Sequence, residues 1–420
     1  MRIAHVANFY GPTSGGLRTA MHELGRGYLE RGHDYLMVVP GPHDADEETE
    51  FGRRVSVASP VLPLSGGYRV ISRVSQVREI LTGFDPDVLE VSDRTTLRGL
   101  GTWAARRDVP SAFFAHERAD GALGSHLPAW TRRLLPVTRI ADAHNRGTAK
   151  RFATIVCTTA YAAEEFERIG REVAHVPLGV DLERFHPSRR DVALRAEYAD
   201  PTEALLLMAS RLSAEKRPDL AIGAVRILVE RGRRVRLVSA GTGALEAAVR
   251  ADAAGLPVDF LGFVKGRSRF ARLLATADAV VAPGPIETFG LAALEALASG
   301  TPAVVNAASA LPEVVGDARH VADGTPAVVN AASALPEVVG DAGHVADGTP
   351  VAFADAIERV LDRDEESRRA AARARAETMP WSATVDSMLA LHTRALEQTA
   401  DRPAANLHRR PGREQTRPRR

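Results

Sequence analysis

The sequence is short of several features, and each shortage excludes a class of protein. Cys157 is the only cysteine among 420 residues. No internal disulfide can form, so we expect a buried thiol in a reducing compartment. The formal net charge is only +1, which gives no overall field directing the chain to nucleic acid. No apolar stretch approaches the roughly 20 residues that span a bilayer. The first one, Ile3 to Ala7, is too short for a signal peptide, so we expect a cytoplasmic chain.

The composition is that of a globular protein, with 45% hydrophobic and 25% charged residues. Short apolar runs alternate with amphipathic patterns, which predicts parallel sheets covered by helices on both faces. The predicted strands are 3–7, 35–39, 88–91, 112–115, 155–158, 205–209, 236–240, 259–261 and 279–282. The predicted helices include 17–30, 73–81, 219–230, 244–254, 267–275, 291–298, 351–361 and 381–398.

The pattern restarts near residue 205, which predicts two αβα sandwiches in series. The segment Val176–Pro187 is a suitable linker, because Pro and Gly flank a short apolar stretch. We expect an N-terminal domain at 1–178, a C-terminal domain at 179–379, a final helix at 380–398 and a disordered tail at 399–420. The tail is rich in Arg and Pro and almost free of apolar residues.

Three segments place chemistry-bearing residues just after predicted strands. Gly15 and Gly16 let backbone N–H groups approach an anion at a helix start, and the absence of GxGxxG disfavours a nicotinamide cofactor. Arg211 and Lys216 are suited to bind a pyrophosphate, Arg211 as a bidentate hydrogen-bond donor and Lys216 as a point charge. His116 ends a third strand, where α/β proteins bind ligands. The alternatives are a tight structural turn for the Gly pair, a solvated basic loop for Arg211 and Lys216, and a structural role for His116.

The most informative segment is Pro285-Ile-Glu-Thr-Phe-Gly-Leu291, followed by Glu295. A carboxylate does not bind phosphate, so Glu287 and Glu295 are suited instead to hydroxyl groups of a sugar and a ribose. The helix start should direct three backbone N–H groups at a pyrophosphate, those of Phe289, Gly290 and Leu291. A solvated helix face is the alternative for two Glu eight positions apart.

Together these segments resemble the retaining glycosyltransferases of family GT4, which have the GT-B fold. The Gly-Gly loop, the Pro-Leu-Gly-Val-Asp hinge, the Arg-x4-Lys loop and the Glu-x7-Glu segment match that family over roughly residues 1–398. The sequence is especially similar to actinobacterial GDP-mannose-dependent α-mannosyltransferases that act on phosphatidylinositol mannosides. The stretches that carry this similarity are 6–12, 14–19, 66–69, 90–94, 116–118 and 282–291.

The resemblance implies an α/β fold of two Rossmann-like domains facing a central cleft, with the C-terminal helix returning to the N-terminal domain. It implies retaining transfer by front-face attack, in which the enzyme stabilises the departing diphosphate. The implied catalytic residues are His116, Glu287, Arg211 and Lys216. The implied donor-binding residues are Gly16, Arg211 and Lys216 at the diphosphate, Glu287 at the mannose, Glu295 at the ribose, and Phe289, Gly290 and Leu291 at the helix start.

The sequence departs from the family pattern at two positions. Ser210 and Arg217 stand where many relatives have Gly, but both adjoin the clamp without replacing its charges. No metal-binding Asp-x-Asp is evident, so we assign no metal and no cofactor besides the nucleotide-sugar donor.

The implied acceptor is a lipid at the inner membrane leaflet, with acceptor candidates at Tyr10, Tyr68 and Arg69. Residues 126–150 contain Trp130 and several basic residues. They are suited to an anionic leaflet, where each basic residue adds about 1 kcal/mol. An ordinary helix with a solvated basic face is the alternative. We expect a monomer that binds no nucleic acid and is cytoplasmic, peripheral at the inner face of the plasma membrane.

Residues 300–323 recur almost unchanged at 324–347, the only difference being Arg319 against Gly343. Two copies are too few for a solenoid. Near-identity indicates a recent tandem duplication or an error in assembling the sequence. We expect Ala303–Val305 in the second sheet and roughly one repeat length outside it.

Two other classes of function compete with GDP-mannose:lipid mannosyl transfer. One is a GT4 transferase with another nucleotide-sugar donor or a soluble acceptor. The other is a non-catalytic sugar-nucleotide-binding protein disabled by the duplication. A sugar-nucleotide epimerase would not explain the full set of segments.

Overall fold

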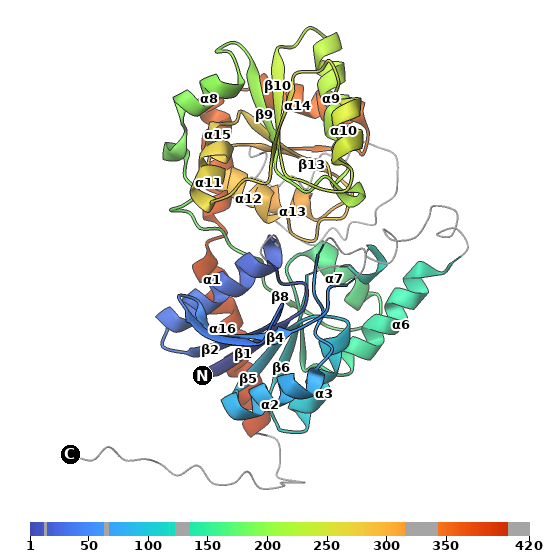
Figure 1. The fold of residues 1–420 in the computed structure, drawn as a ribbon, viewed down its shortest axis with the longest axis vertical. Coiled ribbons are helices and arrows are strands. Elements are labelled where there is room, and N and C mark those ends of the chain that lie inside the picture. The colour runs from blue at the N-terminus through green and yellow to red at the C-terminus, as the bar shows by residue number, and fades with distance from the viewer. Residues whose placement is uncertain (12–14, 63–66, 117, 122–134, 316–342, 402–420) are drawn as a thin grey trace, which may run out of the picture.

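The computed structural model describes residues 1–420 except 12–14, 63–66, 117, 122–134, 316–342 and 402–420. Two parallel sheets follow one another along the chain, each covered by helices (Figure 1). They are the two αβα sandwiches that the alternating pattern predicts.

The first sheet has the strand order β3-β4-β2-β1-β5-β6-β7-β8. All its pairs are parallel except β3 with β4. Its strands are β1 (Arg2–Ala7), β2 (Asp34–Gly41), β3 (Ala45–Thr49), β4 (Gly52–Ala58), β5 (Val88–Ser92), β6 (Ser111–Ala115), β7 (Thr154–Cys157) and β8 (Ala174–His175). The accompanying helices are α1 (Gly16–Glu30), α2 (Val74–Phe84), η1 (Thr96–Gly99), α3 (Leu100–Ala105), α6 (Val137–Ala149) and α7 (Ala160–Glu167).

Alternate residues of this sheet enter two different cores because side chains of a strand point to opposite faces. Ala4 and Val6 pack with α2, α3 and α7 on one face. Ile3 and Ala7 pack with α1 and the last helix on the other. Cys157 is fully buried in the first of these cores, as its apolar run predicts.

The second sheet has the order β11-β10-β9-β12-β13-β14, with every pair parallel. Its strands are β9 (Ala204–Met208), β10 (Val235–Ala240), β11 (Val258–Gly262), β12 (Ala279–Ala282), β13 (Ala303–Asn306) and β14 (Gly343–Ala346). Its helices are η2 (Pro187–Arg189), α8 (Val192–Tyr198), η3 (Ala214–Lys216), α9 (Pro218–Glu230), α10 (Glu246–Asp252), α11 (Arg267–Thr276), α12 (Leu291–Ala298), α13 (Leu311–Val315), α14 (Pro350–Leu361) and α15 (Glu365–Glu377).

The last helix, α16 (Trp381–Ala400), returns to the first sheet and packs against α1 (Figure 1). The contact is close, because a Cβ on Gly27 would lie 2.4 Å from Cγ2 of Val385. Where the chain crosses back, the Val180 N–H donates to the Met379 carbonyl at 3.0 Å. The predicted fold class is therefore confirmed, including the return of the C-terminal helix. That helix continues to Ala400, past the predicted start of the tail.

The local patterns placed most elements within a few residues, but several were missed, among them β8 and the helices α3, α7 and α8. The antiparallel pair β3 and β4 was not predicted, because β3 is mostly exposed and has no apolar run to reveal it. Helix α15 was not predicted either, since its sequence is dominated by Arg, Glu and Ala.

The duplicated segment contributes one part of each copy to the second sheet. The first copy supplies β13 and α13, and β13 pairs with β12 from Val280↔Ala303 to Ala282↔Val305, which confirms the predicted strand. The second copy supplies β14, whose first residue Gly343 pairs with Ala303. The second Ala-Val-Val stretch, at 327–329, lies outside the described residues.

Deletion of residues 324–347 should raise the melting temperature. It would place the nearly identical Arg319-His-Val-Ala sequence after α13 and shorten the α13–β14 connection roughly ninefold. Loop closure would then cost on the order of 2 kcal/mol less. Thermal melts of the full chain and the deletion test this.

The matched deletion of 319–342 differs from it only in retaining Gly343 in place of Arg319. A difference between the two deletions would therefore isolate the effect of that one residue on β14. An unchanged or lower melting temperature in both would show that the extra copy is structurally integrated.

Candidate functional site

The loops after β6 and β7 of the first sheet meet the loop after β12 of the second. Oγ1 of Thr159 donates to the Thr288 carbonyl at 2.8 Å, and Oγ1 of Thr288 donates to the His116 carbonyl. Parallel α/β sheets bind ligands outside the carboxyl ends of their strands. Both sheets therefore present their ligand-binding ends to this junction.

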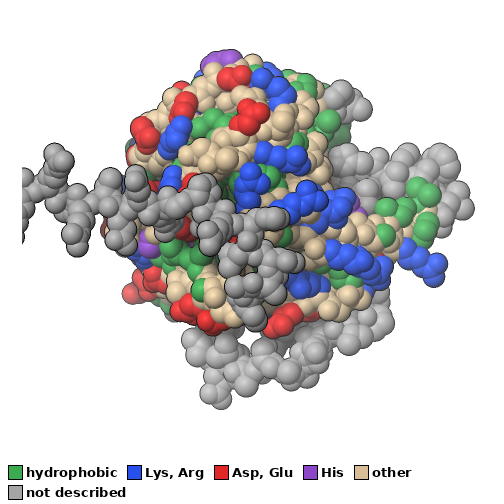
Figure 2. Space-filling view, turned by 90° about the horizontal axis from the view of Figure 1, so that it is seen from below, with side chains coloured by type: hydrophobic (Ala, Val, Ile, Leu, Met, Phe, Trp, Pro, Cys, Tyr) green, Lys and Arg blue, Asp and Glu red, His purple; other side chains and the backbone are tan. Residues whose placement is uncertain are grey.

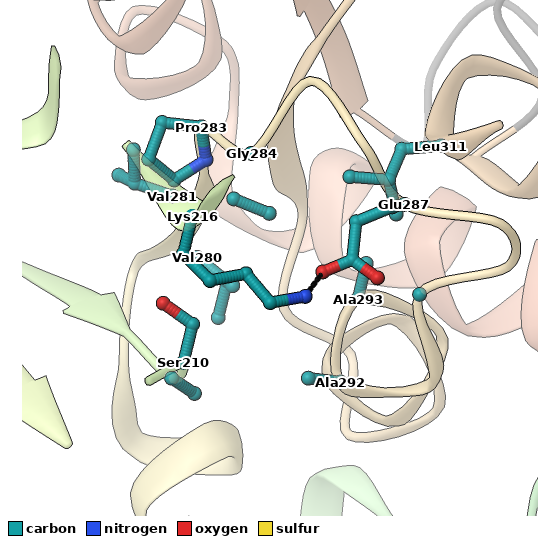
Figure 3. Close-up of a pocket in the computed structure, with 13 residues that line it drawn as sticks. Ser210, Lys216, Val280, Val281, Pro283, Gly284, Glu287, Ala292, Ala293 and Leu311 are labelled. Atoms are coloured by element: carbon teal, nitrogen blue, oxygen red, sulfur yellow. Dashed lines mark hydrogen bonds and ion pairs between the residues drawn. The ribbon is translucent and has the colours of Figure 1, made fainter. Parts of the chain in front are cut away.

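A small pocket beside the ends of β9 and β12 of the second sheet brings together two residues that the sequence places far apart. Lys216, at the end of η3, and Glu287, in the loop before α12, form an ion pair across it. Figure 3 shows the two side chains reaching toward each other, with Ser210, Gly284 and Leu311 around them. Glu287 precedes the helix, which begins at Leu291, so the two Glu of this segment do not share one helix face.

The N-terminal turn of α12 borders the same pocket, as Gly290, Ala292 and Ala293 line it. Gly290 has φ +83°, and a Cβ there would lie 2.0 Å from Cδ2 of Leu311. A residue without a side chain is needed here, in the left-handed conformation that starts the helix. The positive end of a helix then adjoins a cation and a carboxylate. Phe289 itself is buried in the core of this domain.

Glu295 lies one turn further on, outside this pocket lining. Its side chain is buried, and Oε1 is 2.8 Å from Nη2 of Arg267. Burial raises the pKa of Glu295, with Arg267 opposing the change. Arg267 contacts only Oε1, and the predicted contact of this carboxylate with a ribose stays a prediction.

Arg211 extends from the loop after β9 and is more than half exposed, with Nη2 2.9 Å from Oε1 of Glu215. Two glycines that the sequence reasoning did not single out hold this loop. A Cβ on Gly241 would lie 1.9 Å from the Ser210 carbonyl oxygen, and one on Gly243 would lie 2.2 Å from that of Leu212. The signal was present as Gly-Thr-Gly directly after a predicted strand.

His116 lies at the carboxyl end of β6 and its ring stacks on Phe114, with centroids 5.5 Å apart. Nε2 of His116 is 2.8 Å from Oγ of Ser92. Its pKa is lowered to about 3, first by burial and then by the charges of His5 and Arg94. His116 is therefore neutral at physiological pH.

The neutral state of His116 should make folding depend on pH. The ordinary pKa of 6.5 falls to about 3 in the folded chain, so the unfolded chain binds a proton that the folded chain does not. Stability contributed in this way is present above about pH 6.5 and is lost as the pH falls toward 3. Between about pH 7 and 5 the melting temperature should drop more for the wild type than for His116→Gln. Parallel drops would contradict it.

The acceptor candidates surround the loop after β1. Tyr10 OH lies 2.7 Å from Nε2 of His22, and the Tyr68 ring meets Phe9 edge-on at 6.1 Å. Nη1 of Arg69 donates to the Ser59 carbonyl at 2.6 Å.

Gly16 starts α1, where a Cβ would lie 3.9 Å from Cδ1 of Leu291. Gly16 is thus beside the start of α12, and the roles of all four residues stay predictions.

The remaining predicted features fall partly outside the described residues. Of the segment 126–150, residues 126–134 are outside them, and both Leu135, just before α6, and Ile140, within α6, are exposed. Within the ranges that the structure describes, no helix is long and apolar enough to cross a membrane. In the same ranges, no group of three or more His, Cys, Asp or Glu side chains is arranged to hold a metal. Metal independence stays a prediction.

Two family models match the chain. "Glycosyltransferase Family 4" matches residues 14–184, and "Glycosyl transferases group 1" matches residues 191–322. A GDP-mannose-dependent alpha-(1-6)-phosphatidylinositol dimannoside mannosyltransferase of Mycobacterium tuberculosis is 44% identical over 93% of this chain and 95% of its own length. A GDP-mannose-dependent alpha-mannosyltransferase of Corynebacterium glutamicum is 28% identical over 72% of each chain.

Solved structures agree in fold at low sequence identity. Sucrose-phosphate synthase from Thermosynechococcus elongatus has a TM-score of 0.73 at 19% identity, covering 94% of this chain and 99% of that one. WaaG, a glycosyltransferase involved in lipopolysaccharide biosynthesis, has a TM-score of 0.67 at 18% identity, covering 93% and 99%.

Proposed function

Because the chain belongs to glycosyltransferase family 4, we propose that it transfers mannose from GDP-mannose to a phosphatidylinositol mannoside, retaining the anomeric configuration. The ion pair between Lys216 and Glu287 carries the proposal. It places a cation suited to a phosphate and a carboxylate suited to hydroxyl groups side by side at the N-terminus of α12. The 44% identical relative named for this reaction supports the choice of donor and acceptor.

Donor binding would exchange this ion pair for two contacts to the substrate. Lys216, with Arg211, would neutralise the diphosphate as its bond to the sugar breaks, while Glu287 would accept hydrogen bonds from the mannose. Charge develops on the leaving diphosphate, so a cation fixed beside it stabilises the transition state more than the ground state. The first-turn N–H groups of α12 act in the same direction.

The acceptor would approach from the first sheet, on the side of His116 and the loop after β1. The Thr159, Thr288 and His116 contacts already tie the two sheets together at this point. Closure of the site around both substrates supplies positioning and excludes water, which would otherwise hydrolyse the donor.

Release of GDP from GDP-mannose, measured with and without phosphatidylinositol mannosides, tests the proposal. We expect release that depends on the lipid, together with a mannosylated lipid product. Turnover with UDP-glucose in place of GDP-mannose, or with a soluble acceptor alone, would favour another GT4 activity. GDP-mannose binding without turnover would favour a non-catalytic protein.

A lipid acceptor also requires contact with a membrane, and α6 is the candidate surface. Arg139, Arg146 and Lys150 are exposed on or beside it, near the exposed Ile140. Figure 2 shows basic and apolar side chains mixed on the lower face of the molecule. We propose that this helix docks the protein, as a monomer, on the inner leaflet.

The purified protein should therefore sediment with anionic liposomes at low salt, and less so at high salt. Changing Arg139, Arg146 and Lys150 together to Gln should abolish most of the binding. The matched control changes Arg226, Arg250 and Arg272 to Gln, which removes the same charge from other helices. No sedimentation at any salt concentration would count against membrane docking.

A further inference from the structure

A continuous chain of buried polar groups leads from His116 into the first sheet. Oγ of Ser92 lies 2.8 Å from Nε2 of His116 and 2.7 Å from Nε2 of His5. Nδ1 of His5 lies 2.9 Å from Oε2 of Glu90. Oε1 of Glu90 lies 2.7 Å from Nε2 of His392 in α16 and accepts a hydrogen bond of 2.7 Å from Tyr28 OH in α1.

The strand register assembles this chain. His5 of β1 pairs directly with Glu90 of β5, and Ser92 follows Glu90 two residues later on the same face. Helices α1 and α16 cover that face, so His5, Glu90 and His392 are completely buried. The ring of Phe114 stacks against both His5 and His116.

Glu90 is ionised in this setting. Burial alone would raise its pKa, but the charge of His5 and the hydrogen bond from His392 outweigh burial and hold the pKa well below its ordinary value. A buried carboxylate requires a compensating positive charge, because the desolvation of an unpaired ion is too costly. His5 and His392 are the two groups that can carry the proton.

Their surroundings favour His5. Both of its ring nitrogens have polar neighbours, with Nδ1 near Glu90 and also 3.1 Å from Tyr35 OH, and Nε2 at Ser92. For His392, Nδ1 has no hydrogen-bond partner among the described residues. An imidazolium donates from both nitrogens, so His392 is the poorer place for the charge.

We propose that Glu90, His5 and Ser92 are positioning residues that fix the proton of neutral His116 on Nδ1. His5 faces the Glu90 carboxylate through Nδ1 and donates from Nε2 to Ser92. Oγ of Ser92 has no other hydrogen-bond partner among the described residues, so its single hydrogen goes to Nε2 of His116, which leaves the ring proton of His116 on Nδ1. Because Nε2 is engaged by Ser92, Nδ1 is the nitrogen left for a ligand, and there it would act as a donor.

In the reaction, which rests on the proposed function, such a donor would bind an oxygen of the sugar or of the acceptor. It would not act as a general base. If His5 were neutral, the Ser92 hydrogen would point the other way and His116 would present a bare Nδ1. The network therefore decides whether Nδ1 of His116 donates or accepts a hydrogen bond. The carboxylate that sets this direction, Glu90, acts through His5 and Ser92.

Imidazole nitrogen NMR of the full chain, labelled with ¹⁵N in its His rings, tests this without any substrate. Signals are assigned with the variants His5→Gln and His116→Gln. We expect His5 protonated on both nitrogens and His116 neutral with its proton on Nδ1. A wild-type His116 protonated on Nε2 would overturn the proposal without any further variant.

Ser92→Ala should release His116 from that tautomer and lower kcat roughly 10- to 100-fold, with KM for GDP-mannose within about twofold. Ser92→Thr, which restores the hydroxyl, should recover both the His116 tautomer and kcat. The matched control is Ser239→Ala, since Ser239 is equally buried in the second sheet and its hydroxyl has no partner among the described residues. A His116 tautomer unchanged in Ser92→Ala would also overturn the proposal. Absence of mannosyl transfer by the wild type would refute the proposed function. The NMR measurement of the His116 tautomer would still decide the proposal about Glu90, His5 and Ser92.

Discussion

Lys216→Ala should lower kcat for mannosyl transfer by about 10²- to 10³-fold, the range for losing a group that stabilises transition-state charge. Lys216 is the cation in the pocket at the start of α12, where it pairs with Glu287. Without it, the leaving diphosphate would rely on Arg211 and on backbone N–H groups. The change should act on kcat more than on KM, because the charge on the leaving group grows as the bond breaks. Steady-state kinetics with GDP-mannose measure both.

A control for removal of one charge is Arg226→Ala. Arg226 pairs with Asp252 at 2.8 Å between α9 and α10, away from the pocket lining. Its loss should leave kcat within about twofold of the wild-type value. A double-mutant cycle with Glu287→Gln should show strong coupling, since the two side chains contact each other. A fall of less than about tenfold in Lys216→Ala would remove Lys216 from the catalytic set.

Gly241→Ala should destabilise the protein by about 1–3 kcal/mol and strongly impair donor binding. Its Cβ would lie 1.9 Å from the Ser210 carbonyl oxygen and 2.8 Å from the Ser210 carbonyl carbon. Both are backbone atoms, so no side-chain rotation can relieve the contact and the loop that carries Arg211 must move. Thermal melting measures the first effect, and titration with GDP measures the second.

Gly83→Ala provides the matched comparison. A Cβ on Gly83 meets nothing within 4 Å, and the residue lies exposed within α2. Alanine favours a helix over glycine by about 1 kcal/mol, so this variant should be as stable as the wild type or more so. If Gly241→Ala bound GDP as tightly as Gly83→Ala does, the loop that carries Arg211 would not depend on the close approach of Gly241 to Ser210.

The repeat shows a limit of local patterns. The two copies are nearly identical in sequence, so each predicts the same strand and the same short helix. The fold takes β13 and α13 from the first copy and β14 from the second. Chain connectivity explains the choice, because α12 leads directly into the first copy and α14 follows directly on the second.

The sequence by itself determined most of the order of strands and helices, because an apolar run buried in a parallel sheet and an amphipathic helix each leave a local signature. It also determined which residues carry charge next to glycine at strand ends, and through them the family. Tertiary structure alone decided the partners. Lys216 pairs with Glu287, 71 positions away, and His392 reaches Glu90 across 302 positions. The resemblance assigned Lys216 and Glu287 to one site but not to direct contact, and the sequence gives no sign of the second pair. Such contacts arise where separate strands end at one sheet edge, or where a distant helix covers a sheet face.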